Sequence, residues 1–127
     1  MAKIIITKGR PYELSVTIKA PSQIVPLELT DTAEAVFYII DKDKGDQILS
    51  VDMTRILPLE NGEFLASLDI DQTILLPSEL YSMEDGGLFK STCRGHIAVT
   101  DTANTKPEFH HLDSLIPDIY VADLGTV

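Results

Sequence analysis

Residues 12–19 alternate without exception between apolar and polar side chains, and this pattern restricts the possible folds more than any other part of the chain. Successive side chains of a β-strand point to opposite faces, so the pattern predicts a strand with one face in a core and the other in water. The core-facing side chains would be those of Tyr12, Leu14, Val16 and Ile18.

Similar extended segments recur between turn-forming residues along the rest of the chain. They predict further strands at residues 3–7, 33–41, 47–53, 54–59, 63–70, 88–100 and 119–121. The segment at residues 33–41 is apolar on both faces in its middle, which is typical of a central strand. Residues 41–46 are expected to turn the chain back into a hairpin, and Gly95 is the expected site of a bulge.

One segment, residues 71–80, lacks the two-residue period. A short helical turn or an irregular crossover is expected there, with residues 74–82 as the helical stretch. About seven or eight short strands and one short helical turn predict an all-β fold, which we interpret as an antiparallel β-sandwich. A chain of 127 residues can bury one core but not two independent ones, so residues 1–127 are expected to form a single domain.

The charge balance and the cysteine content exclude several classes of function. Ten basic side chains against twenty acidic ones give a formal charge of −10, which makes nucleic acids and anionic membranes unfavourable partners. Cys93 is the only cysteine, which excludes an intramolecular disulfide and a thiolate metal cluster. The first residues contain only three consecutive isoleucines, far fewer than a signal peptide or a membrane span needs. We therefore expect no nucleic-acid partner, no membrane partner and no secretion by a signal peptide.

Asp41, Asp43 and Asp46 surround Gly45 and resemble the start of a calcium-binding loop. In such a loop oxygen ligands stand at alternate positions, with glycine at the sixth position and a bidentate glutamate at the twelfth. Here Gly45 takes the fifth position, Asp46 the sixth and Asp52 the twelfth. The mismatch favours a solvated hairpin turn over a calcium site.

His110 and His111 lie close in the sequence to Glu108 and Asp113, and four such side chains could in principle bind zinc or transfer a proton. Adjacent histidines of an extended chain point in different directions and rarely bind one ion together. A polar loop with its own hydrogen bonds is therefore the preferred interpretation of these residues.

Cys93 and the serines are the available nucleophiles, but the residues around them do not resemble a catalytic motif. A buried, unreactive thiol is the preferred interpretation of Cys93. The third histidine, His96, is expected on the opposite face of the same strand, because its spacing from Cys93 is odd. Glycine-rich phosphate loops are also absent from the sequence, so we expect no enzyme, no cofactor and no metal.

Several stretches of the first half of the chain carry a pattern shared with a known family. They are residues 9–14 (GRPYEL), 26–30 (PLELT), 35–41 (AVFYIID) with Gly45, and 61–68 (NGEFLASL). This pattern resembles the immunoglobulin-like domain at the start of upper-baseplate proteins and in other small tail components of tailed bacteriophages. The resemblance implies an immunoglobulin-like sandwich. Upper-baseplate proteins usually continue into a long helical or receptor-binding-protein-holding region, which this chain lacks, so the resemblance implies a stand-alone collar, adaptor or decoration subunit.

Our first hypothesis is thus a non-enzymatic structural protein of a phage virion, assembled in the host cytoplasm, that docks onto other tail proteins and copies of itself. Two apolar segments near the ends of the chain have little charge to guard their edges, which makes them candidates for the contact. The candidate interface residues are Ile4, Ile5, Ile6, Ile119, Tyr120 and Val121. The alternative is that both segments pair inside the domain, as terminal strands of sandwiches often do.

A second hypothesis is a carbohydrate- or small-ligand-binding β-sandwich, in which tyrosine rings stack against a sugar. The candidate rings are Tyr12, Tyr38, Tyr81 and Tyr120. The absence of tryptophan from the sequence disfavours this hypothesis. An enzyme is the third alternative, because a fold can bring together a site that no local motif announces.

Overall fold

A computed structural model describes residues 4–17, 29–30, 32–57, 62–78, 91–105, 107 and 110–122. Over these ranges the protein is mostly β, with eight strands and one short helix. The elements are β1 (Ile4–Thr7), β2 (Tyr12–Thr17), β3 (Glu34–Asp41), β4 (Gln47–Asp52), β5 (Thr54–Arg55), β6 (Glu63–Leu68), α1 (Ile70–Thr73), β7 (Ser91–Thr100) and β8 (His111–Ala122). The predicted all-β class is confirmed.

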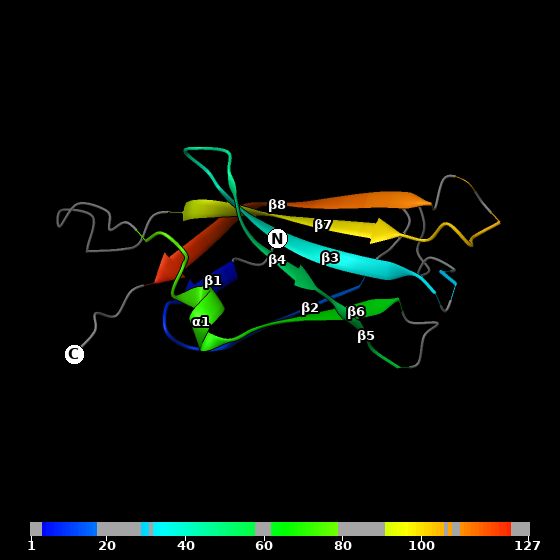
Figure 1. The fold of residues 1–127 in the computed structure, drawn as a ribbon, viewed down its shortest axis with the longest axis horizontal. Helices are drawn as coiled ribbons and strands as arrows, with labels where there is room; N and C mark the ends of the chain where they lie inside the picture. Colours follow the sequence, from blue (N-terminus) through cyan, green and yellow to red (C-terminus); the bar gives the residue numbers. More distant parts are fainter. Residues whose placement is uncertain are drawn as a thin grey trace.

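The strands form two sheets that lie one over the other (Figure 1). The larger sheet has the order β1-β8-β7-β3-β4, and the smaller one has the order β2-β6-β5. Buried side chains of both sheets join in one apolar cluster, to which Phe37 and Ile97 contribute from the larger sheet and Phe64 and Leu68 from the smaller. The core therefore lies between the two layers.

β2 has the alternating burial that its sequence predicts. Tyr12, Leu14 and Val16 pack against the core, while the side chains between them are exposed. The strand pairs antiparallel with β6, with Leu14 opposite Ala66. The predicted hairpin of β3 and β4 is also confirmed, and β3 is a central strand because β7 pairs with its other edge.

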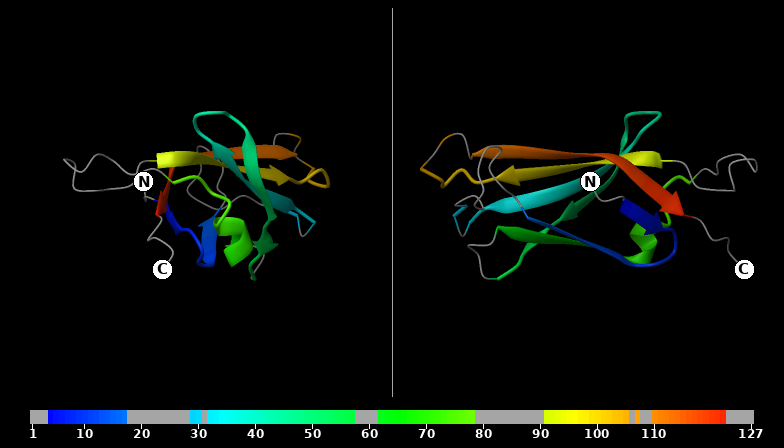
Figure 2. Two further views of the ribbon diagram at one scale, coloured as in Figure 1. Left: turned by 60° about the vertical axis from the view of Figure 1, so that its left-hand side comes forward. Right: turned by 180° about the vertical axis from the view of Figure 1, so that it is seen from behind.

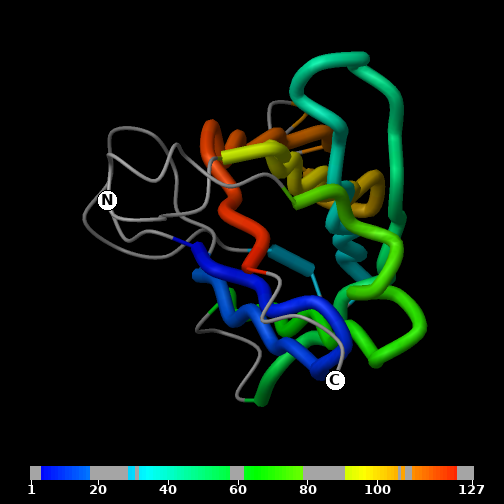
Figure 3. The backbone as a smooth tube through the Cα atoms, turned by 90° about the vertical axis from the view of Figure 1, so that its left-hand side faces the viewer, coloured from blue at the N-terminus to red at the C-terminus, as the bar shows by residue number. Residues whose placement is uncertain are grey.

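One strand pair is parallel, which corrects the expectation of an antiparallel arrangement throughout. β1 runs in the same direction as the end of β8, with Ile4 opposite Ile119 and Thr7 opposite Ala122. A tight turn would make two strands antiparallel, whereas a parallel pair needs a long connection, and most of the chain lies between these two strands. Figure 2 and Figure 3 show the red end of β8 leaving the upper layer to lie beside the blue β1. The pair closes one side of the space between the layers.

β8 is much longer than the predicted strand at residues 119–121, since it begins at His111. The sequence pattern missed its first part because Ser114 interrupts the apolar positions that face buried residues of β7, and because Pro117 is a poor strand residue. Pro117 is tolerated where the register of β7 and β8 shifts between the pairs Gly95–Ile116 and Cys93–Ile119. The polar loop predicted around the two adjacent histidines is therefore wrong for His111, which is part of the strand.

The helix lies earlier in the chain than predicted. Asp69 caps α1 through its side chain, which accepts a hydrogen bond from the Gln72 N–H at 2.9 Å, while the Gln72 side chain accepts one from the Asp69 N–H. This capping box ends β6 at Leu68, two residues before the predicted end at residue 70. The residues after 78 in the predicted helical stretch lie outside the described part of the chain, as does the end of the predicted strand at residues 54–59.

Gly95 occupies a tightly packed position of β7. A Cβ atom added there would lie 3.0 Å from Cε1 of Phe37 and 3.1 Å from Cδ1 of Ile119. The register of β7 and β8 shifts beside Gly95, because two steps along β7 from Cys93 to Gly95 correspond to three along β8 from Ile119 to Ile116. The irregularity expected at Gly95 is therefore present at this point of the pair, but the extra residue belongs to β8. Gly95 is thus required because the core packs directly against its backbone.

We expect the substitution Gly95→Ala to lower the free energy of unfolding by about 1–3 kcal/mol, because the added methyl group must displace buried side chains. Urea unfolding followed by circular dichroism measures this loss. Arg94→Ala is the matched control on the neighbouring exposed position and should change stability by less than about 0.5 kcal/mol. Equal stability of Gly95→Ala and the native protein would contradict the tight packing at this position.

Candidate interaction surfaces

The candidate interface residues at the two ends of the chain pair with each other. Ile4 lies beside Ile119, Ile5 beside Tyr120, and Ile6 beside Val121. Ile6, Ile119 and Val121 are fully buried. These three side chains therefore belong to the core of the chain itself. The two terminal segments pair with each other inside the domain, which was the alternative to a contact between subunits.

β1 nevertheless offers a surface to a neighbour. It is an edge strand of the larger sheet, and β8 is its only partner strand among the described residues. Ile5 is 52% exposed, and the strand itself contains no charged residue or proline. Edge strands without such features are templates for pairing with another chain.

A second surface is a pocket on the larger sheet, where β7 and β8 shift register. Its volume is about 460 Å³. It is lined by Ile40, Lys42, Arg94, Gly95, His96, Leu115, Ile116 and Pro117. Leu115 is 72% exposed and presents its apolar side chain to solvent at the pocket. The lining thus combines apolar side chains with three basic ones.

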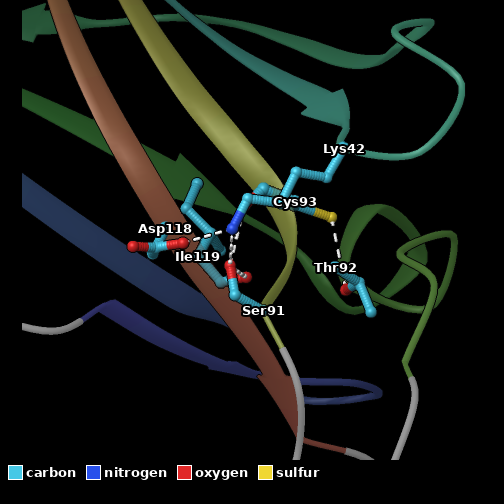
Figure 4. Close-up of polar contacts among 6 residues, drawn as sticks. All are labelled: Lys42, Ser91, Thr92, Cys93, Asp118 and Ile119. Carbon is cyan, nitrogen blue, oxygen red and sulfur yellow. Dashed lines mark hydrogen bonds and ion pairs between the residues drawn. The ribbon is translucent and has the colours of Figure 1, made fainter.

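Two of the three basic side chains are held by neighbouring carboxylates. Lys42 pairs through Nζ with Asp118 and donates a hydrogen bond to Oγ of Ser91 at 2.9 Å (Figure 4). The hydrogen bond from Lys42 is the main reason why the pKa of Asp118 is lowered. His96 lies with Nε2 at 2.7 Å from Oδ1 of Asp113.

Arg94 differs from these two residues. Its side chain is exposed, and within the described ranges this side chain forms no hydrogen bond or ion pair. Of the basic side chains in the described lining, that of Arg94 is therefore the one that remains available to a ligand.

In the calcium-like turn between β3 and β4, the carboxylate of Asp41 binds backbone groups of the turn itself. Oδ1 of Asp41 accepts hydrogen bonds from the N–H groups of Asp43 and Lys44 at 2.9 and 3.1 Å. Gly45 has a positive φ of 75°, a conformation that glycine adopts at little cost. These contacts are those of a hairpin turn stabilised by an aspartate side chain. In the part of the chain that the structure describes, no group of three or more His, Cys, Asp or Glu side chains is placed to hold a metal ion.

The histidine group of the second half does not converge. Nε2 of His110 donates a hydrogen bond to the backbone oxygen of Asn104 at 2.8 Å, whereas His111 is exposed on β8. Asp113 pairs with His96 on the neighbouring strand instead. Glu108, the fourth member of the predicted group, lies outside the described residues.

Cys93 is fully buried, as predicted, and His96 lies on the opposite face of β7. Burial raises the pKa of the Cys93 thiol, which disfavours the reactive thiolate. Figure 4 shows its sulfur beside Oγ1 of Thr92, at 3.7 Å. The structure thus agrees with an unreactive thiol.

The tyrosines do not share one stacking surface. Tyr12 packs against the core, and this burial raises its pKa. Tyr38 and Tyr120 pair with β7 positions His96 and Ser91, which places them about 16 Å apart along the sheet. One sugar ring cannot contact both. Tyr81 lies outside the described residues.

A buried carboxylate that sequence reasoning missed joins two distant segments. Asp101 is 1% exposed and accepts hydrogen bonds from the N–H of Thr30 at 2.9 Å, from the Thr30 hydroxyl, and from Nδ2 of Asn104 at 3.0 Å. Burial acts to raise the pKa of Asp101, but these hydrogen bonds and the charge of Arg55 together outweigh it and lower the pKa. The cluster ties the segment before β3 to the turn between β7 and β8, which is a structural role. The only local signal was the short spacing of Asp101 and Asn104, which is typical of a turn.

No model of a known protein family matches the chain, and no curated protein matches it significantly in sequence. Within the described residues, no helix has the length and apolar character needed to cross a membrane. The proposal of a function therefore depends on the surfaces described above and on the resemblance of the sequence.

Proposed function

We propose that this chain is a non-enzymatic structural protein of a phage virion, a small tail or baseplate subunit of the collar or adaptor type. It docks onto neighbouring tail proteins and onto copies of itself. The observation that carries the proposal is the edge strand β1, which presents an unpaired edge among the described residues and a half-exposed Ile5. An extended segment of a neighbour can add to such an edge by backbone hydrogen bonds, with specificity from the side chains it covers.

The proposal includes a single immunoglobulin-like sandwich over residues 1–127. In variable-type immunoglobulin domains one sheet contains the strands G, F, C and C′, and the other contains B, E and D. The orders β8-β7-β3-β4 and β2-β6-β5 correspond to these two sheets, with β1 added beside β8. This correspondence supports the proposal, although the sequence lacks the tryptophan and the second cysteine of antibody domains.

The stretches that resemble phage tail proteins fall on elements of this arrangement. Residues 9–14 lead into β2, residues 35–41 belong to β3, and residues 63–68 form β6. In the PLELT stretch, Thr30 binds the buried Asp101, whereas residues 26–28 lie outside the described part of the chain, as does Asn61. The resembling stretches therefore correspond to strands that contribute to the core and to the hydrogen bonds between Thr30 and Asp101.

Purified particles of the phage that encodes this chain are expected to contain it in several copies, because a collar or adaptor subunit is repeated around the tail. Quantitative mass spectrometry of gradient-purified particles, scaled to the major tail protein, measures the copy number. A non-structural protein of the same phage, which purification should remove, is the control. Detection of the chain only among free proteins of the lysate would overturn the proposal.

A further inference from the structure

We infer that the pocket on the larger sheet binds an acidic segment of a partner protein, with an apolar side chain in the pocket and a carboxylate on Arg94. The inference rests on the proposed docking function and names the chemistry of one partner. It concerns a surface separate from the β1 edge, because the pocket lining comes from β3, β7, β8 and the turn after β3.

The apolar part of the lining accounts for the first half of this inference. Ile40, Leu115, Ile116 and Pro117 line the pocket, and Leu115 exposes most of its side chain to solvent. Covering an apolar side chain stabilises a complex by about 25 cal/mol per Å² of surface removed from water.

The charges of the lining account for the second half. Among the residues that the structure describes, no acidic side chain lines the pocket, although the chain carries twenty acidic residues. The nearby Asp113 and Asp118 are paired with His96 and Lys42. Arg94 is left to bind a carboxylate, which its planar guanidinium can contact with two parallel hydrogen bonds.

The net charge of the chain decides between two kinds of occupant. A contact between copies at the β1 edge involves an uncharged strand, whereas an acidic segment of a second copy would bring a further charge of −10 toward a pocket that already has Asp113 and Asp118 beside it. A second copy is therefore disfavoured as the source of the acidic segment at this pocket. A partner protein needs only one acidic side chain at Arg94, and physiological salt screens the remaining repulsion beyond about 8 Å. We therefore assign the pocket to a different protein.

Titration of the isotopically labelled 127-residue chain with blocked peptides tests this assignment by nuclear magnetic resonance. The first peptide, Ala-Leu-Glu-Leu-Ala, carries a carboxylate between two leucines, and the second has glutamine in place of glutamate. We expect the glutamate peptide to shift the backbone signals of Gly95, His96 and Leu115. We expect the glutamine peptide to bind at least about tenfold more weakly, because it lacks the charge-assisted hydrogen bonds.

A pair of charge reversals locates the contact. Arg94→Glu should weaken binding of the glutamate peptide at least about tenfold, because it removes the cation and adds repulsion. Arg10→Glu makes the same change in net charge at an exposed residue outside the pocket lining, and it should change the affinity by less than about twofold.

Four results would overturn the inference. They are no binding at millimolar peptide, equal binding of the two peptides, equal effects of the two charge reversals, and pocket signals that shift with the concentration of the protein alone. The last result would assign the pocket to a second copy. None of these results affects the copy number in particles or the contact at β1, so a failure of the pocket is distinguishable from a failure of the proposed function.

Discussion

Replacing Ile6 with lysine is expected to lower the free energy of unfolding by at least about 3 kcal/mol, whereas the same substitution at Ile5 should cost less than about 1 kcal/mol. The two residues are neighbours on β1, but Ile6 is fully buried and Ile5 is half exposed. A lysine at position 6 must either bury its ammonium group or distort the pair of β1 and β8. Urea unfolding of both variants measures the difference.

Ile5→Lys should have a large effect on assembly, although its effect on the stability of the isolated protein is small. A charge on an edge strand opposes pairing with another strand, so the folded variant should be lost from purified particles. Leu57→Lys is the matched control, because Leu57 is 76% exposed and follows β5, which belongs to the other sheet. Unfolding of the Ile5→Lys variant in isolation, or its normal incorporation into particles, would show that this contact surface is wrong.

Removing the Asp101 carboxylate should have the second large effect. We expect Asp101→Ala to lower the free energy of unfolding at neutral pH by about 2–3 kcal/mol, because the substitution leaves the Thr30 N–H and the Asn104 amide without their acceptor. Asp43→Ala, at an exposed position of the turn between β3 and β4, should change stability by less than about 0.5 kcal/mol. Similar stabilities of the two variants would contradict a stabilising role for Asp101.

The Asp101 carboxylate should also make the free energy of unfolding depend on pH in the acidic range. The pKa of Asp101 is lowered in the folded state, so the unfolded state binds more protons as the pH falls below the usual aspartate value of about 3.9. The stability that Asp101 contributes is therefore present above that pH and is lost as the pH falls through the folded-state value. Urea unfolding across this range should show a shallower loss of stability for Asp101→Asn than for the native protein. Parallel pH dependences would contradict this assignment.

The strands with a strong local pattern could be predicted from the sequence alone. β2, β3, β4 and β6 lie where alternation and turn residues placed them, and the burial of Cys93 follows from its place in an alternating segment. Such features are local, because the direction of a side chain depends on the two-residue period of its own strand. The capping box at Asp69 was also local, but it was hidden by an apolar pattern that continues from β6 into α1.

The sequence by itself therefore determined which segments are extended, which of their faces are apolar, and that the fold is all-β. Only the tertiary structure decided the partner of each strand. The parallel pairing of β1 with β8 joins the two ends of the chain, and Asp101 meets Thr30 across 71 residues. The pocket beside Arg94 lies where β7 and β8 shift register, and it is lined by residues of three strands. The physical reason is that pairing and register depend on the free energy of the whole packed core, to which distant residues contribute together, and no local pattern contains that sum.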